Sequence, residues 1–589
     1  MERGVILRGQ LLFAGNVVKK VLILLLAIAW PISAWAGVTY YVSNASPVGS
    51  DSNNGTSISS PWLTIAKINA STFRPGDSVL LNRGCTWREQ LTVVSSGTSG
   101  NPITFGAYGS GANPVISGAD LVGAWSNYSE NVWQATVANQ PNVVILSGAV
   151  GTKCTSLEQL TAQGCWFWGG GTLYLYSASS PASAYPSPGA EAGRRSYALY
   201  LDGCSYLNFN NIDLVAGNLY SIFMDGETSN IAYDSVGILK AYTEGINHQS
   251  QYRASYVVIQ NSVAAFNGAV GILATGNTDH WTIQNNTVYN NGYTYEQGGV
   301  ENTWGGGIKL VSGPGVTCGL HVIKNNTVYY NGYKGNGVAR ACPVPNKGFG
   351  IWVDTVGTVG NTVEYNNVFN NADDGIYIEK SSSQRVDYNL SHGNAGNGIS
   401  VSDSDGINSS GTYNNGVYNN TSYGNALAGL AVIGNYNQSG LSVYNNTLEN
   451  NISVGNGSEL AAQWGGENLG GLGRGNIYSY NLLGPSSSNF IQWGRSIGVN
   501  VYYSAYSSWE PSYCGSVGCS HSVQADPDFV STSGRDFRLQ PGSPAIKAGT
   551  NVGLASDYAG NPVPGIPDVG AYEFTAPIQA PTGIRLISE

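Results

Sequence analysis

The middle of the chain repeats one short pattern, and this repeat constrains the fold more than any other feature. An Asn, one further residue and an apolar residue are followed after a few polar residues by Gly-Ile, with a basic period of 23 to 26 residues and insertions in some copies. The repeated Asn residues are Asn261, Asn286, Asn326, Asn366, Asn389, Asn420 and Asn446. The Gly-Ile pairs begin at Gly245, Gly271, Gly307, Gly350, Gly375 and Gly398, and Gly429-Leu430 is the last. A repeat this short must stack on its neighbours to bury an apolar face.

Apolar and polar residues alternate within each repeat, as in Ile351-Trp352-Val353-Asp354. This period of two indicates strands with one face turned inward. Gly and Asn between the strands supply turns, because both tolerate left-handed backbone. The pattern therefore predicts an all-β parallel solenoid, in which Asn residues at a fixed coil position stack in a ladder.

Composition agrees with many short strands. Charged residues make up only 11% of the chain, less than half of the roughly 25% usual in globular domains. The 79 Gly argue against a helical protein, and 42% hydrophobic residues argue against disorder. A net charge of −10 makes nucleic acid an improbable partner.

The N-terminus has the order of a secretory signal. Lys19 and Lys20 precede an apolar run over 21–32, and Ala34-Trp35-Ala36 follows. We therefore predict a signal peptide over 1–36 and a secreted, extracellular or periplasmic protein. The run is short for a membrane span, and we expect none elsewhere.

Eight cysteines, an even number in an exported chain, favour disulfides. Three pairs are close enough in sequence to brace loops, and the pairing stays open: Cys154 with Cys165, Cys318 with Cys342, and Cys514 with Cys519. The chain contains neither C-x-x-C nor H-E-x-x-H, so we expect no metal site of those kinds.

The repeats resemble the right-handed parallel β-helix, or pectin-lyase-like, superfamily of secreted carbohydrate-active proteins, over most of 38–480. Residues 37–118, with R-P-G-D-S-V-L-L and N-P-I-T-F-G-A-Y-G, look like the entry of such a helix, capped by a short helix around 62–70. Residues 119–195 are an irregular β insertion or decorated early coils, and 196–525 form the main coils. Residues 526–574, with D-F-R-L-Q-P-G-S-P-A-I, resemble a C-terminal capping module whose acids cap turns, and 575–589 are a tail.

Stacked repeats bring residues at equal offsets from Gly-Ile into columns. One outward column contains Asp354 and Glu379 on consecutive coils, with no insertion between them. Strands lie about 4.8 Å apart. Retaining glycosidases separate their two carboxyls by about 5 to 5.5 Å, and inverting ones by about 6.5 to 9.5 Å. The column therefore favours a retaining pair, in which one carboxyl stays protonated beside the other.

The two strands G-I-W-V-D (350–354) and G-I-Y-I-E (375–379) resemble the paired strands of β-helical glycoside hydrolases, in particular a β-xylosidase family. That resemblance implies Asp354 as nucleophile and Glu379 as acid/base. The following Lys380-Ser381-Ser382-Ser383 departs from that family's pattern, which bears on xylose specificity. The alternative is that both acids are ordinary solvated residues.

Other residues are candidates for substrate binding. Trp352 and Tyr377 stand beside the acids and offer rings for sugar stacking, and Lys309 shares their column. Trp304 and Arg340 lie on long insertions that can wall a cleft. Asp374, with Asp373, is a candidate ligand of a sugar hydroxyl or of Ca²⁺, although turn capping is the alternative. No other cofactor is expected.

Three functions follow from these residues. The first is a glycoside hydrolase acting on poly- or oligosaccharides through Asp354 and Glu379. The second is a polysaccharide lyase or uronate epimerase that uses Lys309 and the basic residues near it in the sequence, which are Arg340, Lys347, Lys380 and Arg385. The third is a non-catalytic solenoid that binds glycans. The sugar, its linkage and the oligomeric state do not follow from the sequence.

Overall fold

The computed structural model of the protein describes residues 37–46, 48–292, 305–312, 318–333, 348–403, 411–434, 442–463, 475–485, 489–496, 499–509 and 520–576. The predicted signal peptide over 1–36 and most of the predicted tail lie outside these residues. Among the described segments, no helix is long and apolar enough to cross a membrane.

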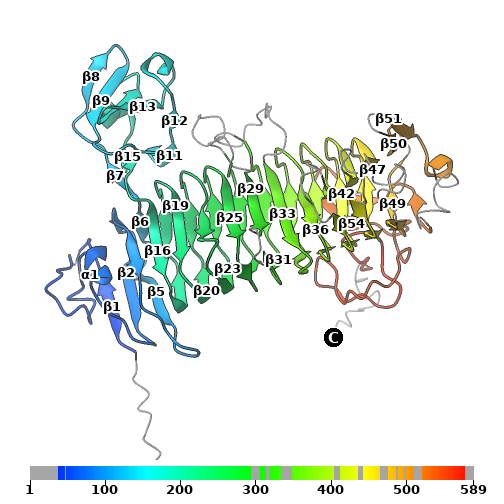
Figure 1. Cartoon of the computed structure of the whole chain (residues 1–589), viewed down its shortest axis with the longest axis horizontal. Coiled ribbons are helices and arrows are strands. Elements are labelled where there is room, and N and C mark those ends of the chain that lie inside the picture. The colour runs from blue at the N-terminus through cyan, green and yellow to red at the C-terminus, as the bar shows by residue number, and fades with distance from the viewer. Residues whose placement is uncertain are drawn as a thin grey trace, which may run out of the picture. The chain divides into compact units, whose positions relative to one another are not determined.

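The chain winds through three long sheets, and each coil contributes one strand to each sheet in turn (Figure 1). Consecutive coils pair in parallel, as the repeat predicted. Sheet 1 has 15 strands. Its strands are β1 (Thr39–Val42), β2 (Ser78–Asn82), β5 (Ile103–Tyr108), β17 (Ser205–Asn210), β20 (Thr228–Asp234), β23 (Ala254–Gln260), β26 (Thr278–Asp279), β27 (Thr282–Gln284), β30 (Cys318–Gly319), β31 (Val322–Lys324), β34 (Thr362–Glu364), β37 (Arg385–Asp387), β41 (Gly416–Tyr418), β45 (Thr447–Glu449) and β48 (Ile477–Ser479).

Sheets 2 and 3 have 13 strands each. Sheet 2 consists of β3 (Thr86–Trp87), β6 (Val115–Ser117), β18 (Asp213–Val215), β21 (Gly237–Leu239), β24 (Val263–Ala265), β28 (Thr287–Tyr289), β32 (Thr327–Tyr329), β35 (Asn367–Phe369), β38 (Leu390–His392), β42 (Thr421–Tyr423), β46 (Ile452–Val454), β49 (Leu482–Leu483) and β52 (Val523–Gln524). Sheet 3 consists of β4 (Leu91–Val93), β16 (Tyr197–Asp202), β19 (Tyr220–Asp225), β22 (Ile246–His248), β25 (Val270–Thr275), β29 (Gly306–Val311), β33 (Phe349–Gly357), β36 (Ile376–Ser381), β39 (Ile399–Ser402), β43 (Ala428–Ile433), β47 (Ser458–Gln463), β50 (Ile491–Ser496) and β51 (Val499–Tyr503). A separate parallel pair joins β40 (Thr412–Tyr413) to β44 (Val443–Tyr444).

The Gly-Ile pairs occupy the start of the strands in sheet 3. Their Ile side chains point into one continuous core and are at most 1% exposed: Ile246, Ile272, Ile308, Ile351, Ile376 and Ile399. Burying one such side chain is worth roughly 1.5 to 3 kcal/mol. The preceding Gly is required because a Cβ on Gly350 would lie 2.5 Å from the carbonyl oxygen of Gly375 on the next coil.

Two ladders of buried Asn side chains tie the coils together. The first lies at the corner between sheets 1 and 2 and consists of Asn286, Asn326, Asn366, Asn389, Asn420, Asn451 and Asn481. The second lies between sheets 2 and 3 and consists of Asn267, Asn291, Asn331, Asn371, Asn394, Asn425 and Asn456. Except at the last rung of each ladder, the Asn donates both its backbone N–H and its side-chain amide to the Oδ1 of the next rung, as Asn366 does to Asn389 at 2.9 and 3.0 Å.

The predicted ladder is therefore confirmed, with two changes of membership. Asn261 has left-handed backbone and lies one residue before the ladder position. Ser262 occupies that position and donates its backbone N–H to the Oδ1 of Asn286. Asn446 belongs to a neighbouring ladder with Asn415 and Asn476.

A short helix, α1 (Ile65–Asn69), lies in the predicted 62–70 segment. Thr64 caps it, because its side chain accepts a hydrogen bond from the Lys67 N–H at 3.0 Å. Ile65 and Ile68 join the continuous core next to the first coils.

Residues 119–195 form two small sheets with mostly antiparallel pairing and an apolar cluster of their own (Figure 1). The first contains β7 (Ala119–Leu121), β10 (Val144–Leu146), β11 (Ala149–Val150) and β15 (Ala190–Gly193). The second contains β8 (Ser126–Ser129), β9 (Val132–Thr136), β12 (Thr152–Lys153), β13 (Cys165–Gly169) and β14 (Thr172–Tyr176). The short helices η1 (Leu157–Gln159) and α2 (Pro181–Ala184) lie in the connections.

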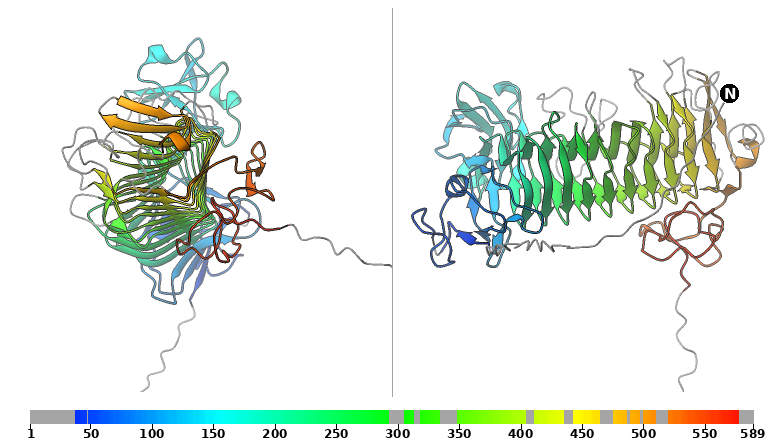
Figure 2. Two further views of the ribbon diagram at one scale, coloured as in Figure 1. Left: turned by 90° about the vertical axis from the view of Figure 1, so that its right-hand side faces the viewer. Right: turned by 60° about the horizontal axis from the view of Figure 1, so that its bottom comes forward.

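The C-terminal module lies beside the coils, whereas we expected it to close the last one (Figure 2). It contains β53 (Phe529–Ser531) and β54 (Asp536–Leu539). Phe529 and Phe537 pack in one apolar cluster with Ile452 and Leu482 of sheet 2. The open end of the core is filled instead by Trp493 and by a segment with Tyr506 and Trp509.

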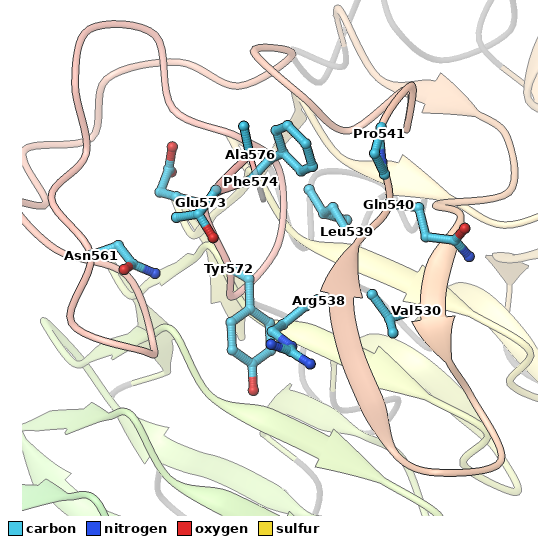
Figure 3. Close-up of a pocket in the computed structure, with 11 residues that line it drawn as sticks. Val530, Arg538, Leu539, Gln540, Pro541, Asn561, Tyr572, Glu573, Phe574 and Ala576 are labelled. Atoms are coloured by element: carbon cyan, nitrogen blue, oxygen red, sulfur yellow. The ribbon is translucent and has the colours of Figure 1, made fainter. Parts of the chain in front are cut away.

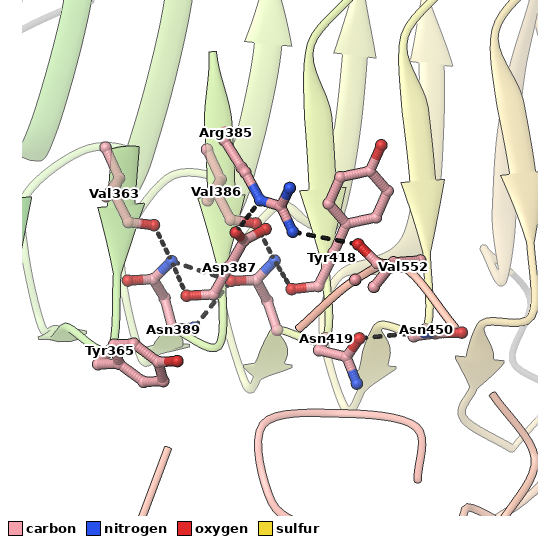
Figure 4. A network of polar contacts seen from close by, with 12 residues as sticks. Val363, Tyr365, Arg385, Val386, Asp387, Asn389, Tyr418, Asn419, Asn450 and Val552 are labelled. Carbon is pink, nitrogen blue, oxygen red and sulfur yellow. Dashed lines mark hydrogen bonds and ion pairs between the residues drawn. The ribbon is translucent and has the colours of Figure 1, made fainter. Parts of the chain in front are cut away.

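Polar contacts fix the C-terminal module to sheet 1 and its corner (Figure 4). Arg385 forms an ion pair with Asp387 and donates a hydrogen bond to the Val552 carbonyl at 3.2 Å. Asn450 and Thr550 exchange two hydrogen bonds. The module's acids cap backbone amides, as predicted: Asp557 accepts from the N–H of Ala559 and Asn561, and Asp568 from those of Lys547 and Phe574.

Of the three suggested disulfides, only that between Cys154 and Cys165 lies within the described residues, and it is not formed. No disulfide joins the five cysteines of the described segments, which are Cys85, Cys154, Cys165, Cys204 and Cys318, all buried. Cys154 and Cys165 share one apolar cluster without a bridge. Cys342, Cys514 and Cys519 lie outside the described residues.

Replacing a ladder residue should destabilise the fold. In Asn366→Ala the backbone N–H of Asn326 and its side-chain amide lose their shared acceptor, and a buried group left without a partner costs about 1 to 3 kcal/mol. We therefore expect a lower free energy of unfolding, measured by urea denaturation. The matched Asn139→Ala changes an exposed residue outside the coils and should have little effect. Equal midpoints for both variants would show that the ladder is not stabilising.

Acid should weaken the contact between sheet 2 and the C-terminal module. His392 stacks on Phe369 and meets Phe537, and burial lowers its pKa to about 3. Below pH 6.5 the unfolded chain binds a proton at this histidine that the folded chain does not. Each unit by which the pH is lowered therefore reduces the free energy of unfolding by about 1.4 kcal/mol from this group. His392→Phe should therefore lose less stability than the wild type between pH 6 and pH 4. His321, whose pKa burial also lowers to about 3, still contributes to the pH dependence of stability in this variant. An unchanged slope would refute this assignment.

Candidate active site

Sheet 3 carries the predicted columns in the predicted register. Val311 pairs with Asp354, and Asp354 pairs with Glu379. The neighbouring column runs from Lys309 through Trp352 to Tyr377. The strands β29, β33 and β36 therefore bring the two acids and Lys309 together on one outer face.

Asp354 is held by two contacts. One carboxylate oxygen lies 2.9 Å from the Lys309 ammonium, and the other accepts a hydrogen bond from the Thr355 hydroxyl at 2.6 Å. The Lys309 side chain is only 8% exposed and that of Asp354 15%. This ion pair is therefore largely shielded from water and fixes the carboxylate.

Aromatic rings support Lys309. Its ammonium lies 3.3 Å from the centroid of the Trp352 ring, within cation–π range. Trp352, Phe349 and Tyr377 form one buried cluster, in which Phe349 and Tyr377 stack at 4.7 Å. Trp352 is 2% exposed and Tyr377 7%. These rings therefore pack beneath the charged residues, whereas we expected exposed ring faces on which a sugar could stack.

Glu379 completes the charged cluster. It is 6% exposed on β36, beside Asp354. Burial lowers the pKa of the Lys309 amine, and the charges of Asp354, Glu379 and Glu244 act in the opposite direction. The charges of three carboxyl groups therefore act on Lys309, and Asp354 is the one at ion-pair distance.

Glu244 is the residue that sequence reasoning missed. Burial raises the pKa of its carboxyl, and the hydrogen bonds from Thr243 and Asn247 and the charge of Lys309 lower it. It directly precedes Gly245-Ile246, the position that Asp374 occupies before Gly375-Ile376. That shared offset marks an acid at the entry to a strand of sheet 3, outside the two columns of the site.

The backbone is left-handed directly after each acid, as it is at many other positions of the coils. Thr355 has φ +51° and Lys380 has φ +46°, and the pairing of β33 with β36 shifts between Asp354 and Gly357. Thr355 stands out because a β-branched residue seldom adopts left-handed backbone.

Asp374 serves the fold. Its carboxylate accepts hydrogen bonds from the N–H and side-chain amide of Asn397 and from the Ser400 hydroxyl on the next coil. The described residues contain no group of three or more His, Cys, Asp or Glu arranged to hold a metal ion. The candidate Ca²⁺ ligands Asp373 and Asp374 thus form no such group.

The structure separates some of the basic residues that we grouped near the site. Arg385 lies on β37 of sheet 1, where it pairs with Asp387 and contacts the C-terminal module. Trp304, Arg340 and Lys347 lie outside the described residues. A cavity of about 530 Å³, lined in part by Arg538, Tyr572 and Glu573, belongs to the C-terminal module and not to sheet 3 (Figure 3).

Comparison with known proteins supports the fold. No family model matches the sequence. The structure is similar to that of XylC in complex with xylose, with a TM-score of 0.60 and 14% identity over 91% of this chain and 98% of that one. The chain folds as a right-handed parallel β-helix. A crystal structure of pectate lyase Pel9A aligns with a TM-score of 0.44 and 17% identity over 91% of this chain and 96% of that one.

One curated relative matches part of the sequence. A segment is 41% identical over 115 residues to lacto-N-biosidase of Bifidobacterium longum. The match covers 18% of this chain and 7% of the relative, so the chain spans only a small part of that protein's length.

Proposed function

We propose that the protein is a glycoside hydrolase that cleaves poly- or oligosaccharides with retention of configuration. The observation that carries the proposal is the register of β33 and β36, which pairs Asp354 with Glu379 on neighbouring strands. Strands about 4.8 Å apart suit the carboxyl separation of about 5 to 5.5 Å in retaining enzymes better than that of inverting enzymes. Paired like charges destabilise a sheet, and this pair is largely buried, with the Asp354 side chain 15% exposed and Glu379 6%. Function is a reason to keep a buried pair of acids.

The two acids would divide the work. Asp354 is held beside Lys309 as a carboxylate and attacks the anomeric carbon, while Glu379 protonates the oxygen of the leaving sugar as the glycosidic bond breaks. Water then gives a proton to Glu379 and attacks the same carbon. The ester bond to Asp354 breaks, and both carboxyls return to their starting states.

The rival functions fit these contacts less well. A polysaccharide lyase or uronate epimerase needs a base and cations for the uronate carboxylate, and the lowered pKa of Lys309 favours a base. Lys309, however, is engaged by Asp354, and Arg385 is engaged on another sheet. Two carboxyls beside Lys309 would also repel a uronate. A glycan-binding solenoid has no need of a buried pair of acids.

The names of the two similar proteins, lacto-N-biosidase and XylC in complex with xylose, indicate carbohydrate-active proteins. They support a carbohydrate substrate without naming the sugar. With the N-terminal signal sequence, we infer that the enzyme acts outside the cytoplasm.

Removing either acid should abolish hydrolysis. We expect Asp354→Asn to lower kcat by at least about 1,000-fold and Glu379→Gln by about 100- to 10,000-fold on neutral oligosaccharides. Asp202→Asn is the matched control, since Asp202 is an exposed acid that pairs with Asp225 on the same sheet. Mass spectrometry of the products provides the measurement.

The mass of the products separates the rival functions. Hydrolysis adds one water to the broken chain, and this gain should vanish in both site variants. Unsaturated products without added water would contradict the proposal and point to a lyase that uses Lys309. Unchanged activity in Asp354→Asn would contradict the assignment of the nucleophile.

A further inference from the structure

Lys309 is the part of the site that the proposed reaction leaves unexplained. It is 6% exposed, on an outer face where a long basic side chain ordinarily extends into water. Burying an ammonium costs several kcal/mol unless carboxylates and hydrogen bonds compensate. The compensating groups here are Asp354, Glu379 and Glu244, from β33, β36 and the segment before β22.

We infer that Lys309 is a positioning residue whose charge neutralises Asp354 before the glycosidic bond breaks and Glu379 afterwards. The inference rests on the proposed function and adds a role that the acid pair alone does not define. It uses only the ion pair to Asp354, the seat over Trp352 and the adjacent position of Glu379.

The charges balance through both steps. At the start Lys309 is positive, Asp354 negative and Glu379 protonated. When Asp354 forms its bond to the anomeric carbon it loses its charge, and Glu379 becomes negative by giving its proton to the leaving oxygen. The charges of Lys309, Asp354 and Glu379 add up to zero before and after the bond breaks. A fixed cation therefore favours the transfer of negative charge from Asp354 to Glu379.

The position of the Lys309 ammonium suits this transfer of negative charge from Asp354 to Glu379. The ammonium rests on the face of Trp352, which pairs with Lys309 on one side and Tyr377 on the other. The two acids pair one column away on the same strands. The cation therefore contacts Asp354, and its charge acts on Glu379 one strand farther along the sheet, without a movement of the backbone.

A set of unfolding measurements tests the inference without a substrate. In Asp354→Asn the neutral side chain imitates the state in which Asp354 is esterified. The coupling between Lys309→Met and Glu379→Gln is measured by urea denaturation at pH 7, first with Asp354 present and then in the Asp354→Asn background. We expect the coupling in the unfolding equilibrium constant to rise to about tenfold in the second background. Equal coupling in both backgrounds would overturn the inference and leave Lys309 as a partner of Asp354 alone.

A pH profile provides the second readout. Loss of a cation makes both carboxyls harder to ionise, so Lys309→Met should move both limbs of the kcat/KM profile to higher pH. Lys309→Arg keeps the charge and should restore both limbs. Lys324→Met on sheet 1 removes a lysine that acts on Glu364 and should leave the profile unchanged. If Lys309→Met lowers the activity but leaves both limbs of the kcat/KM profile at the same pH, Lys309 has only a structural role.

The two readouts separate failure of the inference from failure of the proposed function. If the wild type hydrolyses no glycoside, the proposed function fails, whereas the unfolding measurements still report whether Lys309 shifts its coupling to Glu379. If hydrolysis occurs and the coupling does not shift, the inference alone fails.

Discussion

Stacking in register is the constraint on which the rest of this molecule depends. Buried Asn rungs lock each coil to the next, since Asn366 alone accepts two hydrogen bonds from Asn326 and donates two to Asn389. A slip of one residue would break every rung and turn the inward Ile columns to the surface. The same register sets Asp354 against Glu379, so the interaction that stabilises the fold also fixes the geometry of the candidate site.

The site concentrates charge on a fold that has little of it. The almost fully buried Lys309 ammonium pairs with Asp354 and lies over the Trp352 ring, and the charges of Glu379 and Glu244 also act on it. Removing one member of such a cluster leaves the others uncompensated in a region of low dielectric. The buried charges indicate a site that is held in place at a cost to stability.

Much of this arrangement could be predicted from the sequence, because a solenoid turns spacing into position. The Gly-Ile repeat gave the inward Ile column, and the uninterrupted step from Asp354 to Glu379 gave their pairing. Glu244 was missed because it lies outside the two columns and because an insertion separates its coil from that of Lys309. The burial of Trp352 was missed because Phe349, which covers it, directly follows a long insertion whose path the repeat does not describe. The side position of the C-terminal module depends on outward aromatic residues of sheet 2, such as Tyr423, whose partners lie about a hundred residues away in the sequence.

The central claim is that Asp354 forms a covalent bond to the sugar. The most direct test is incubation with a panel of fluorinated glycosides that carry an activated leaving group, followed by peptide mass spectrometry of the labelled protein. The account predicts one adduct on the peptide that contains Asp354, and no adduct in the Asp354→Asn variant. An adduct on another residue, or release of product with inverted anomeric configuration, would contradict it.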